Sequence, residues 1–255
     1  MQEPSGPLQG LKVLVTRPAQ RASGLCQLIE RAGGSAIHFA AIQIDEPDDT
    51  RSRDYVRNHL TEFELAIFIS PTAVEKTLDY FVALPKNLKL AAIGSKTAHS
   101  LASRGLHIDI EPDGHDTEAL LKHPLLQAER VSALQIVIFR GEGGRRLLGD
   151  TLQHRGANVF YADMYRRLPP ADATQLKALL QQSDVITTSS NTGLQNLYDI
   201  VEAKHLLTEH TLIVPGQRTF NLARTLGFND IIIAENATDE ACLNALKYAK
   251  VKMSD

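Results

Sequence analysis

Short apolar runs alternate with longer segments of helical periodicity along almost the whole chain. Runs such as 65–69 and 211–214 are mostly aliphatic or aromatic, as strands buried on both faces are. The segments between the runs place apolar residues every three or four positions, which is typical of helices. We expect strands at 12–15, 36–44, 65–69, 89–93, 107–111, 135–139, 159–165, 185–188, 211–214 and 231–234, and helices at 20–32, 51–60, 73–84, 96–104, 116–126, 145–155, 174–182, 192–201, 218–226 and 239–250. The alternation predicts an α/β fold with parallel sheets that helices cover on both faces.

The two halves of the chain repeat one another. Three segments recur in the same order: 11–18 as 134–141, 68–72 as 187–191, and 93–97 as 215–219. The offset is nearly constant, at 123 positions from Arg17 to Arg140 and 119 from Ser70 to Ser189. The repeat therefore predicts two similar doubly wound lobes, and a cleft between two lobes is a usual place for a ligand. Two prolines make residues 166–170 the only evident linker.

Composition and charge exclude several classes of protein. The chain has 255 residues and a formal net charge of −3, which predicts no field that would hold a nucleic acid or an anionic membrane. Cys26 and Cys242 lie between apolar neighbours in helical segments, so we expect reduced thiols rather than a disulfide or a metal site. None of the nine histidines has metal-ligand spacing, so we expect no metal. The chain shows no secretion signal and no membrane span, and we expect it in the cytoplasm.

Small polar residues and cations follow the predicted strands. In parallel sheets, the carboxyl ends of the strands bind ligands because helix N-termini direct free N–H groups there. Five cations fall at these turns: Arg17, Lys96, Arg140, Arg145 and Arg218. Each turn alone is explained by helix capping. Six such turns, most with a cation nearby, favour a ligand that carries several carboxylates or phosphates.

Other motifs are weaker. The loop Gly141-Glu142-Gly143-Gly144 lacks the third glycine of a dinucleotide site, and Gly94-Ser95-Lys96-Thr97 departs from the phosphate-loop pattern. Ser70 and Ser189 lack the glycines of a nucleophile elbow. Tyr165 ends a predicted strand next to the linker, where a phenol could donate a proton to a leaving group. On position alone, packing at a lobe boundary explains Tyr165 better.

Taken together, these landmarks resemble the uroporphyrinogen-III synthase family, and the similarity runs from Val13 to the last predicted helix. The segments that carry the resemblance are 13–18, 68–74, 92–98, 137–141, 164–166 and 188–190. Their order and spacing, and the Tyr165-Arg166 pair, make the combination specific. The chain departs from the family pattern at Pro215, which removes one N–H before Thr219.

The resemblance implies a particular domain organisation. It implies two α/β lobes joined by a two-stranded linker, with residues 1–42 and 167–255 forming a discontinuous lobe and residues 43–166 an inserted one. The repeat alone is equally compatible with two contiguous lobes divided near Val131. The crossed arrangement therefore depends on the resemblance.

The resemblance also implies a reaction. The family's substrate is hydroxymethylbilane, a linear tetrapyrrole with eight carboxylates, which loses its terminal hydroxyl as water to give an azafulvene cation. Ring D then attacks, and a spiro intermediate fragments and recloses to uroporphyrinogen III with ring D inverted. Holding the chain curled and assisting the leaving group require no organic cofactor or metal. By analogy Tyr165 is the catalytic residue, and the substrate-binding residues are Arg17, Ser70, Pro71, Thr72, Gly94, Lys96, Thr97, Arg140, Gly141, Ser189, Ser190 and Thr219.

Two alternatives stay open at this point. A non-catalytic two-lobe protein could close on a polycarboxylate ligand, and Tyr165 would then only pack a boundary. A nucleotide-dependent α/β enzyme is the third possibility, although the glycine pattern fits it poorly. For the synthase we expect a monomer without nucleic-acid or membrane partners, in transient contact with the preceding enzyme of the pathway.

Overall fold

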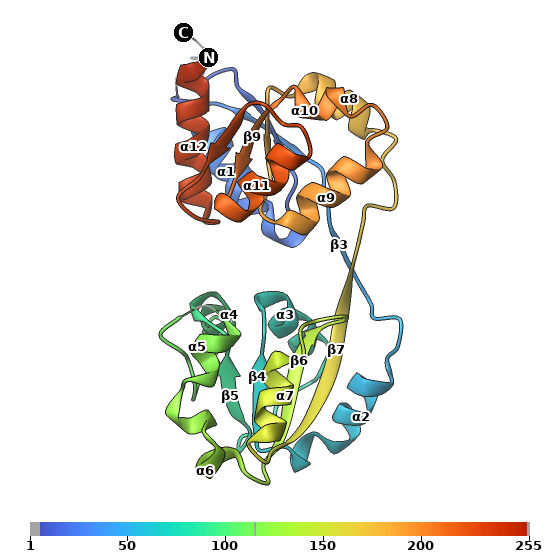
Figure 1. Ribbon diagram of the computed structural model, residues 1–255, viewed down its shortest axis with the longest axis vertical. Coiled ribbons are helices and arrows are strands. Elements are labelled where there is room, and N and C mark those ends of the chain that lie inside the picture. Colours follow the sequence, from blue (N-terminus) through green and yellow to red (C-terminus); the bar gives the residue numbers. More distant parts are fainter. Residues whose placement is uncertain (1–5, 115, 254–255) are drawn as a thin grey trace. The chain divides into compact units, whose positions relative to one another are not determined.

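The computed structural model describes residues 6–114 and 116–253, and the chain forms two compact units. The first unit comprises Met1–Ile44 and Leu168–Asp255, and the second comprises Asp45–Arg167. The family resemblance implies boundaries at 42/43 and 166/167, and the structure divides the chain at 44/45 and 167/168. Each unit has its own five-stranded sheet with helices on both faces (Figure 1).

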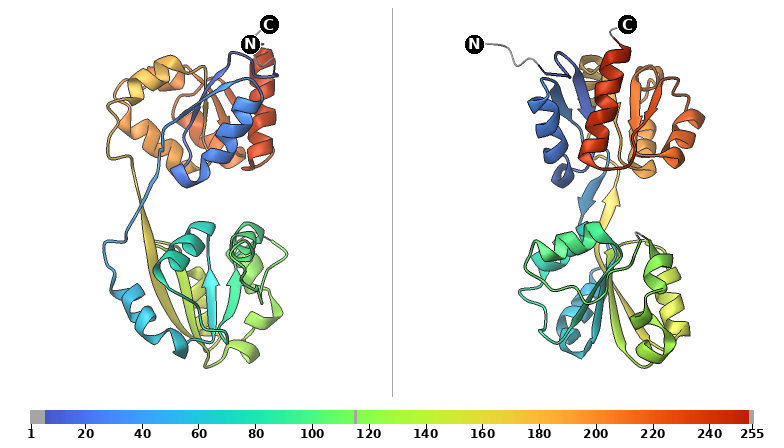
Figure 2. Two further views of the ribbon diagram at one scale, coloured as in Figure 1. Left: turned by 180° about the vertical axis from the view of Figure 1, so that it is seen from behind. Right: turned by 90° about the vertical axis from the view of Figure 1, so that its left-hand side faces the viewer.

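The first unit has the strand order β10-β9-β8-β1-β2. Its neighbouring strands pair in parallel. The strands are β1 (Lys12–Val15), β2 (Ser35–His38), β8 (Val185–Thr187), β9 (Thr211–Val214) and β10 (Ile231–Ile233). The side chains of β1 alternate between two cores, with Val13 and Val15 on one face and Leu14 on the other. Figure 2 shows the blue N-terminal segments packed beside the red C-terminal helix within this unit.

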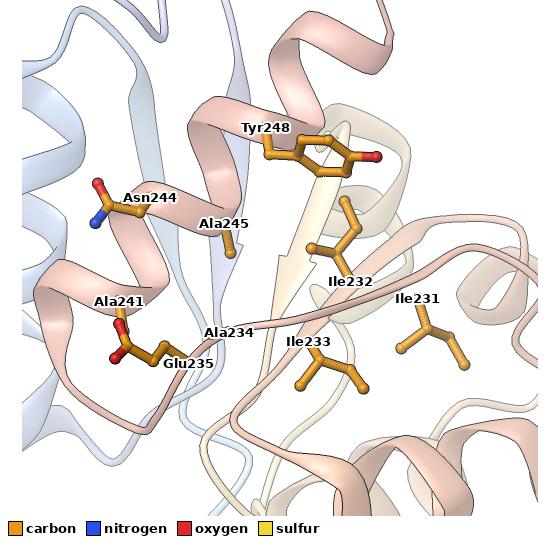
Figure 3. Close-up of a pocket in the computed structure, with 9 residues that line it drawn as sticks. All are labelled: Ile231, Ile232, Ile233, Ala234, Glu235, Ala241, Asn244, Ala245 and Tyr248. Carbon is orange, nitrogen blue, oxygen red and sulfur yellow. The ribbon is translucent and has the colours of Figure 1, made fainter.

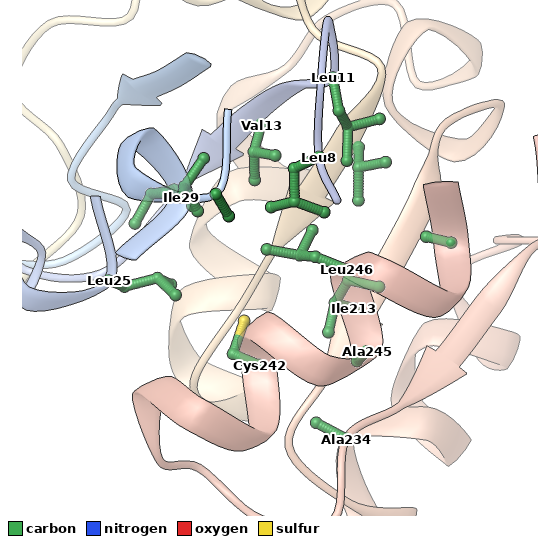
Figure 4. Close-up of a cluster of buried hydrophobic side chains, with 14 of the residues drawn as sticks. Leu8, Leu11, Val13, Leu25, Ile29, Ile213, Ala234, Cys242, Ala245 and Leu246 are labelled. Carbon is green, nitrogen blue, oxygen red and sulfur yellow. The ribbon is translucent and has the colours of Figure 1, made fainter. Parts of the chain in front are cut away.

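Two helices cover one face of this sheet and four cover the other. On the face of Val13, α1 (Ser23–Arg31) and α12 (Asp239–Lys252) pack through Leu25, Ile29 and Leu246 (Figure 4). The face of Leu14 is covered by α8 (Leu176–Gln182), α9 (Asn191–Ile200), α10 (His205–Thr208) and α11 (Gln217–Thr225). Both faces of the sheet are therefore covered, which explains why its central strands are mostly apolar.

The second sheet has the strand order β3-β7-β6-β4-β5, and its edge strand β3 crosses the boundary between the units at 44/45. The bounds are β3 (Gln43–Asp45), β4 (Leu65–Phe68), β5 (Lys89–Ala92), β6 (Gln135–Gly141) and β7 (Asn158–Leu168). On one face, α5 (Thr117–Leu121), α6 (Ala128–Val131) and α7 (Leu147–His154) cover a core that contains Ile67 and Ile138. The opposite face is aromatic, with the Phe68 and Phe139 rings stacked at 5.0 Å. The helices α2 (Arg51–His59), α3 (Pro71–Tyr80) and α4 (Ser95–Ala102) complete the unit.

The two sheets exchange strands between the repeated halves of the sequence. The first half supplies β1, β2, β4 and β5, and their counterparts in the repeat are β6, β7, β8 and β9. Four strands of the first sheet run β9-β8-β1-β2, and the equivalent four of the second run β5-β4-β6-β7. Each sheet therefore combines the first strand pair of one half with the second strand pair of the other.

Several predicted elements differ from the observed ones. The strand expected at 36–44 is two strands, because after His38 the chain turns across the end of β1, where Ala41 N donates to Thr16 O at 3.1 Å. The segment 107–111, expected to be a strand, forms a single β-bridge, in which Ile110 pairs with Ala91 of β5. The helix expected at 73–84 ends at Tyr80, because Phe81 leaves it to pack its ring 5.6 Å from Phe139.

Two further differences follow from prolines and from short helices. Pro124 divides the helix expected at 116–126 into α5 and a 3-10 turn, Pro124–Leu126. β7 continues to Leu168, so the linker expected at 166–170 is strand over its first three residues. The short helices α6 and α10 were not predicted, because a single turn carries too little periodicity to detect.

Burial makes the Cys242 thiol unreactive, and this can be tested. Desolvation raises its pKa to about 11, so it is almost entirely protonated at neutral pH. Because the thiolate is the nucleophile, we expect native Cys242 in a Cys26→Ser variant to react with Ellman's reagent at pH 8 at least about 100-fold more slowly than in denaturant. Equal rates in the native and denatured protein would contradict this burial.

The raised pKa of Cys242 also predicts how the free energy of unfolding depends on pH. The contribution of the buried thiol is fully present below about pH 8.5, the ordinary thiol pKa, and is lost as the pH rises toward 11.

Candidate functional site

In the second unit, the turn after β4 is built around Ser70. Its Oγ accepts a hydrogen bond of 3.0 Å from Ala73 N and so caps α3, and Pro71 follows in the first turn, where its missing N–H costs nothing. Thr72 is buried beside this cap. The sequence motif therefore fixes the start of α3 and holds the Ser70 hydroxyl at the carboxyl end of the sheet.

Tyr165 lies against this cap. Its side chain is 1% exposed, and its hydroxyl lies 3.1 Å from Ser70 Oγ and accepts a hydrogen bond of 2.9 Å from Arg167 Nη2. The ring fits because position 141 has no side chain: a Cβ on Gly141 would lie 2.7 Å from Tyr165 Cζ. The structure thus brings three predicted site residues together and adds Arg167, which the prediction missed. The i, i+2 spacing of Tyr165 and Arg167 on a strand, which places both on one face, could have identified it.

Arg140 holds the loop after β6. Its Nε donates to Asp163 Oδ1 at 2.7 Å and its Nη1 to Gly144 O at 3.3 Å, and its guanidinium lies 3.9 Å from the centroid of the Tyr161 ring. Only 12% of the side chain is exposed. Arg140, which the sequence predicts to bind the ligand, is therefore paired with the Asp163 carboxylate and holds the loop after β6 in place.

The first unit repeats this device with Arg17. The guanidinium forms an ion pair with Asp239 in the first turn of α12, and 10% of the arginine side chain is exposed. Arg17 O is in turn bonded to His38 Nε2 at 2.9 Å. Like Arg140, this cation is committed to a carboxylate of its own unit.

Ser190, rather than Ser189, is the structural counterpart of Ser70. Ser190 Oγ caps α9 by accepting from Gly193 N at 3.1 Å, and its backbone angles, φ −163° and ψ 157°, nearly equal those of Ser70, φ −167° and ψ 157°. The sequence alignment of the repeat was therefore displaced by one residue here. Ser189 is half-buried directly before the cap.

A second pair of equivalent turns carries the two predicted threonines. Thr97 N donates to Gly94 O at 3.0 Å and Thr219 N to Gly216 O at 3.1 Å, at the starts of α4 and α11. Both threonines are buried, and Thr219 Oγ1 donates to Asn191 Oδ1 at 2.8 Å. The Thr219 hydroxyl thus connects the turn after β9 to the first turn of α9.

Three of the five predicted cations lie free on the surface. Lys96, Arg145 and Arg218 are exposed and form no ion pair within the described residues 6–114 and 116–253. The predicted residues as a whole divide between the units: Ser70, Pro71, Thr72, Gly94, Lys96, Thr97, Arg140, Gly141 and Tyr165 lie in the second, and Arg17, Ser189, Ser190 and Thr219 in the first.

A groove on the first unit lies apart from these residues. Figure 3 shows it between β10 and α12, lined by Ile231, Ile233, Ala245 and Tyr248 among others. Its volume is about 450 Å³. It contains no predicted site residue. Within the described part of the chain, no three His, Cys, Asp or Glu side chains come together as a metal site requires. Over the same residues, no helix has the length and apolar character to cross a membrane.

Comparisons with known proteins point to one family. A family model described as uroporphyrinogen-III synthase HemD matches residues 23–244. The chain is 31% identical over 248 residues to the uroporphyrinogen-III synthases of Salmonella typhimurium and Escherichia coli, and each alignment covers 93% of this chain and 100% of the relative.

Solved structures show the same fold. A mutant uroporphyrinogen III synthase from Thermus thermophilus aligns with a TM-score of 0.62 at 20% identity, covering 95% of this chain and 100% of that one. The uroporphyrinogen-III synthetase of Helicobacter pylori aligns with a TM-score of 0.62 at 16% identity, covering 96% and 99%. The predicted fold class, two α/β lobes with parallel sheets, is confirmed.

The close approach of Tyr165 to Gly141 makes the glycine sensitive to substitution. We expect Gly141→Ala to lower the free energy of unfolding by about 1–3 kcal/mol, because the added methyl group overlaps the phenol ring. Urea unfolding followed by circular dichroism measures the change. Gly216→Ala is the matched control at another strand-end turn, since no atom lies within 4 Å of its Cβ position and its φ of 163° suits any residue. Equal stability of the two variants would refute the packing argument.

The ion pair of Arg17 should matter more than exposed pairs do. Asp239→Asn leaves a largely buried guanidinium without its counter-charge, and we expect a loss of about 1.5–3 kcal/mol in the free energy of unfolding. Asp150→Asn removes the partner of exposed Arg146 and should leave stability nearly unchanged. Losses of the same size in both variants would show that burial of Arg17 is irrelevant.

Proposed function

The chain belongs to the uroporphyrinogen-III synthase family, and from that premise we propose that its strand-end turns bind hydroxymethylbilane and that Tyr165 supplies the proton for the leaving hydroxyl. The enzyme is a cyclising lyase of tetrapyrrole and heme biosynthesis. The observation that carries the proposal is the enclosed Tyr165 hydroxyl, held between Ser70 and Arg167 at the carboxyl end of the second sheet.

The proposed reaction begins with loss of the terminal hydroxyl as water. A proton from the Tyr165 network lets the hydroxyl leave as water. Ring D then attacks the azafulvene cation that results. The spiro intermediate fragments and recloses to uroporphyrinogen III with ring D inverted. The protein's part is proximity and charge stabilisation, which side chains and backbone amides can supply.

The substrate's eight carboxylates require several donors. We assign the direct electrostatic contacts to the exposed cations Lys96, Arg145 and Arg218, together with the amides and hydroxyls of the capped turns. Arg17 and Arg140 contribute by holding those turns, since each is already paired with a carboxylate. Ser189, Ser190 and Thr219 complete the proposed set in the first unit.

The finer expectations belong to the same proposal. Both cysteines are free thiols, which suits a reducing compartment such as the cytoplasm. We take the active form to be a monomer that receives hydroxymethylbilane in transient contact with the enzyme that produces it.

Product analysis tests the proposal directly. Purified protein is mixed with enzymatically generated hydroxymethylbilane, and the oxidised porphyrin isomers are separated by chromatography. We expect mostly isomer III from the wild type, and a rate at least about 100-fold lower from Tyr165→Phe. A protein-free control gives the spontaneous isomer I. The same isomer I with wild-type protein would reject the synthase and favour a non-catalytic polycarboxylate-binding protein.

A further inference from the structure

The phenol of Tyr165 is closed off from solvent, whereas its partner Ser70 is not. Tyr165 is 1% exposed, Ser70 is half-buried, and their oxygens are 3.1 Å apart. Ser70 is therefore the more accessible of the two residues at the end of β4.

The hydrogen bonds around the two hydroxyls decide which proton is free. Arg167 can only donate, so the Tyr165 oxygen accepts from its Nη2. Ser70 Oγ likewise accepts from Ala73 N. One proton then lies between the two hydroxyls, and the other has no partner in the network.

Burial selects between the two arrangements. If Ser70 donated to Tyr165, the phenol proton would be a buried donor without an acceptor among the described residues, which is an unfavourable arrangement. If Tyr165 donates to Ser70, the unpartnered proton belongs to Ser70, at a half-buried position that solvent or a ligand can reach. The second arrangement is therefore favoured.

We propose that Ser70 is the catalytic residue that delivers the proton to the leaving hydroxyl, and that Tyr165 and Arg167 act through it. The inference rests on the proposed function and adds the order in which the side chains pass the proton to the substrate. The Ser70 Oγ–H proton passes to the hydroxyl oxygen of the substrate, and the C–O bond breaks with its electron pair leaving on water. The phenol proton moves to Ser70 Oγ, and the phenolate is stabilised by the Arg167 guanidinium.

The protein recovers within one turnover the proton that it gives to the substrate. When ring closure is complete, the cyclised cation loses one proton, which returns through Ser70 to the phenolate. Arg167 keeps its proton throughout. The net reaction is loss of one water from hydroxymethylbilane, with no external acid or base consumed.

A double-mutant cycle tests this order. We expect Ser70→Ala and Tyr165→Phe each to lower kcat for isomer III by at least about 100-fold. Because the two groups act in one path, the double variant should lie within about threefold of the slower single variant. Ser70→Thr keeps a hydroxyl and should remain within about tenfold of wild type.

Two further variants separate proton delivery from helix capping and test Arg167. Ser70→Asn keeps an acceptor for Ala73 N but has no hydroxyl, so we expect a normal unfolding midpoint and a kcat as low as that of Ser70→Ala. Arg167→Met should lower kcat about tenfold in wild type and change nothing in the Tyr165→Phe background. Arg167→Lys should restore part of the loss.

Several results would overturn the inference while leaving the proposed function intact. Wild-type formation of isomer III together with an active Ser70→Asn variant and an inactive Tyr165→Phe variant would show that the phenol acts directly. Losses that multiply in the double variant would show two independent roles. Failure of the wild type to form isomer III would instead reject the proposed function itself.

Discussion

The parallel pairing of β1 with β8 is the contact on which the first unit depends. It aligns Val13 with Val185 and Leu14 with Ile186, and so joins two segments that lie far apart in the sequence. Without it, α1 and α12 would have no common sheet to cover, and the two apolar cores on either face would not form. The Arg17–Asp239 ion pair lies at the carboxyl end of the same strand and fastens α12 to that turn.

Charges and hydroxyls have different tasks at the strand ends. The buried arginines meet carboxylates of their own unit and thereby set the loops, while the capping serines present oxygen atoms at helix starts. In the proposed function the exposed cations attract the polyanionic substrate, because a charge already neutralised contributes little to long-range attraction. The two Ser caps have nearly the same geometry, but within the described residues a hydrogen bond to a phenol is found at Ser70 and not at Ser190. Chemistry in the proposed mechanism is therefore confined to one of two similar turns.

Local sequence patterns predicted most helices and strands, but they did not predict contacts between residues far apart in the sequence. The apolar runs at β4 and β9 and the serine cap of α3 follow from neighbouring residues alone, so they could be recognised without a structure. The partners of Arg17 and Arg140 could not, since Asp239 is 222 positions from Arg17 and only the fold brings them together. The repeat predicted two similar units but not which strands each unit takes, because equivalent strands from either half would fit equally well. The displaced match of Ser189 with Ser70 has the same origin: adjacent serines are indistinguishable until one of them is seen to cap a helix.

The exchange of strands also sets an order of events during synthesis. When β7 has left the ribosome, every strand and helix of the second unit is available, and that unit can fold. At that moment β1, β2 and α1 have been translated but lack β8, β9 and α12, so apolar residues such as Leu25 and Ile29 stay uncovered. The first segment to leave the ribosome is thus among the last to be buried. During that interval it is the part of the nascent chain most exposed to aggregation and to chaperones.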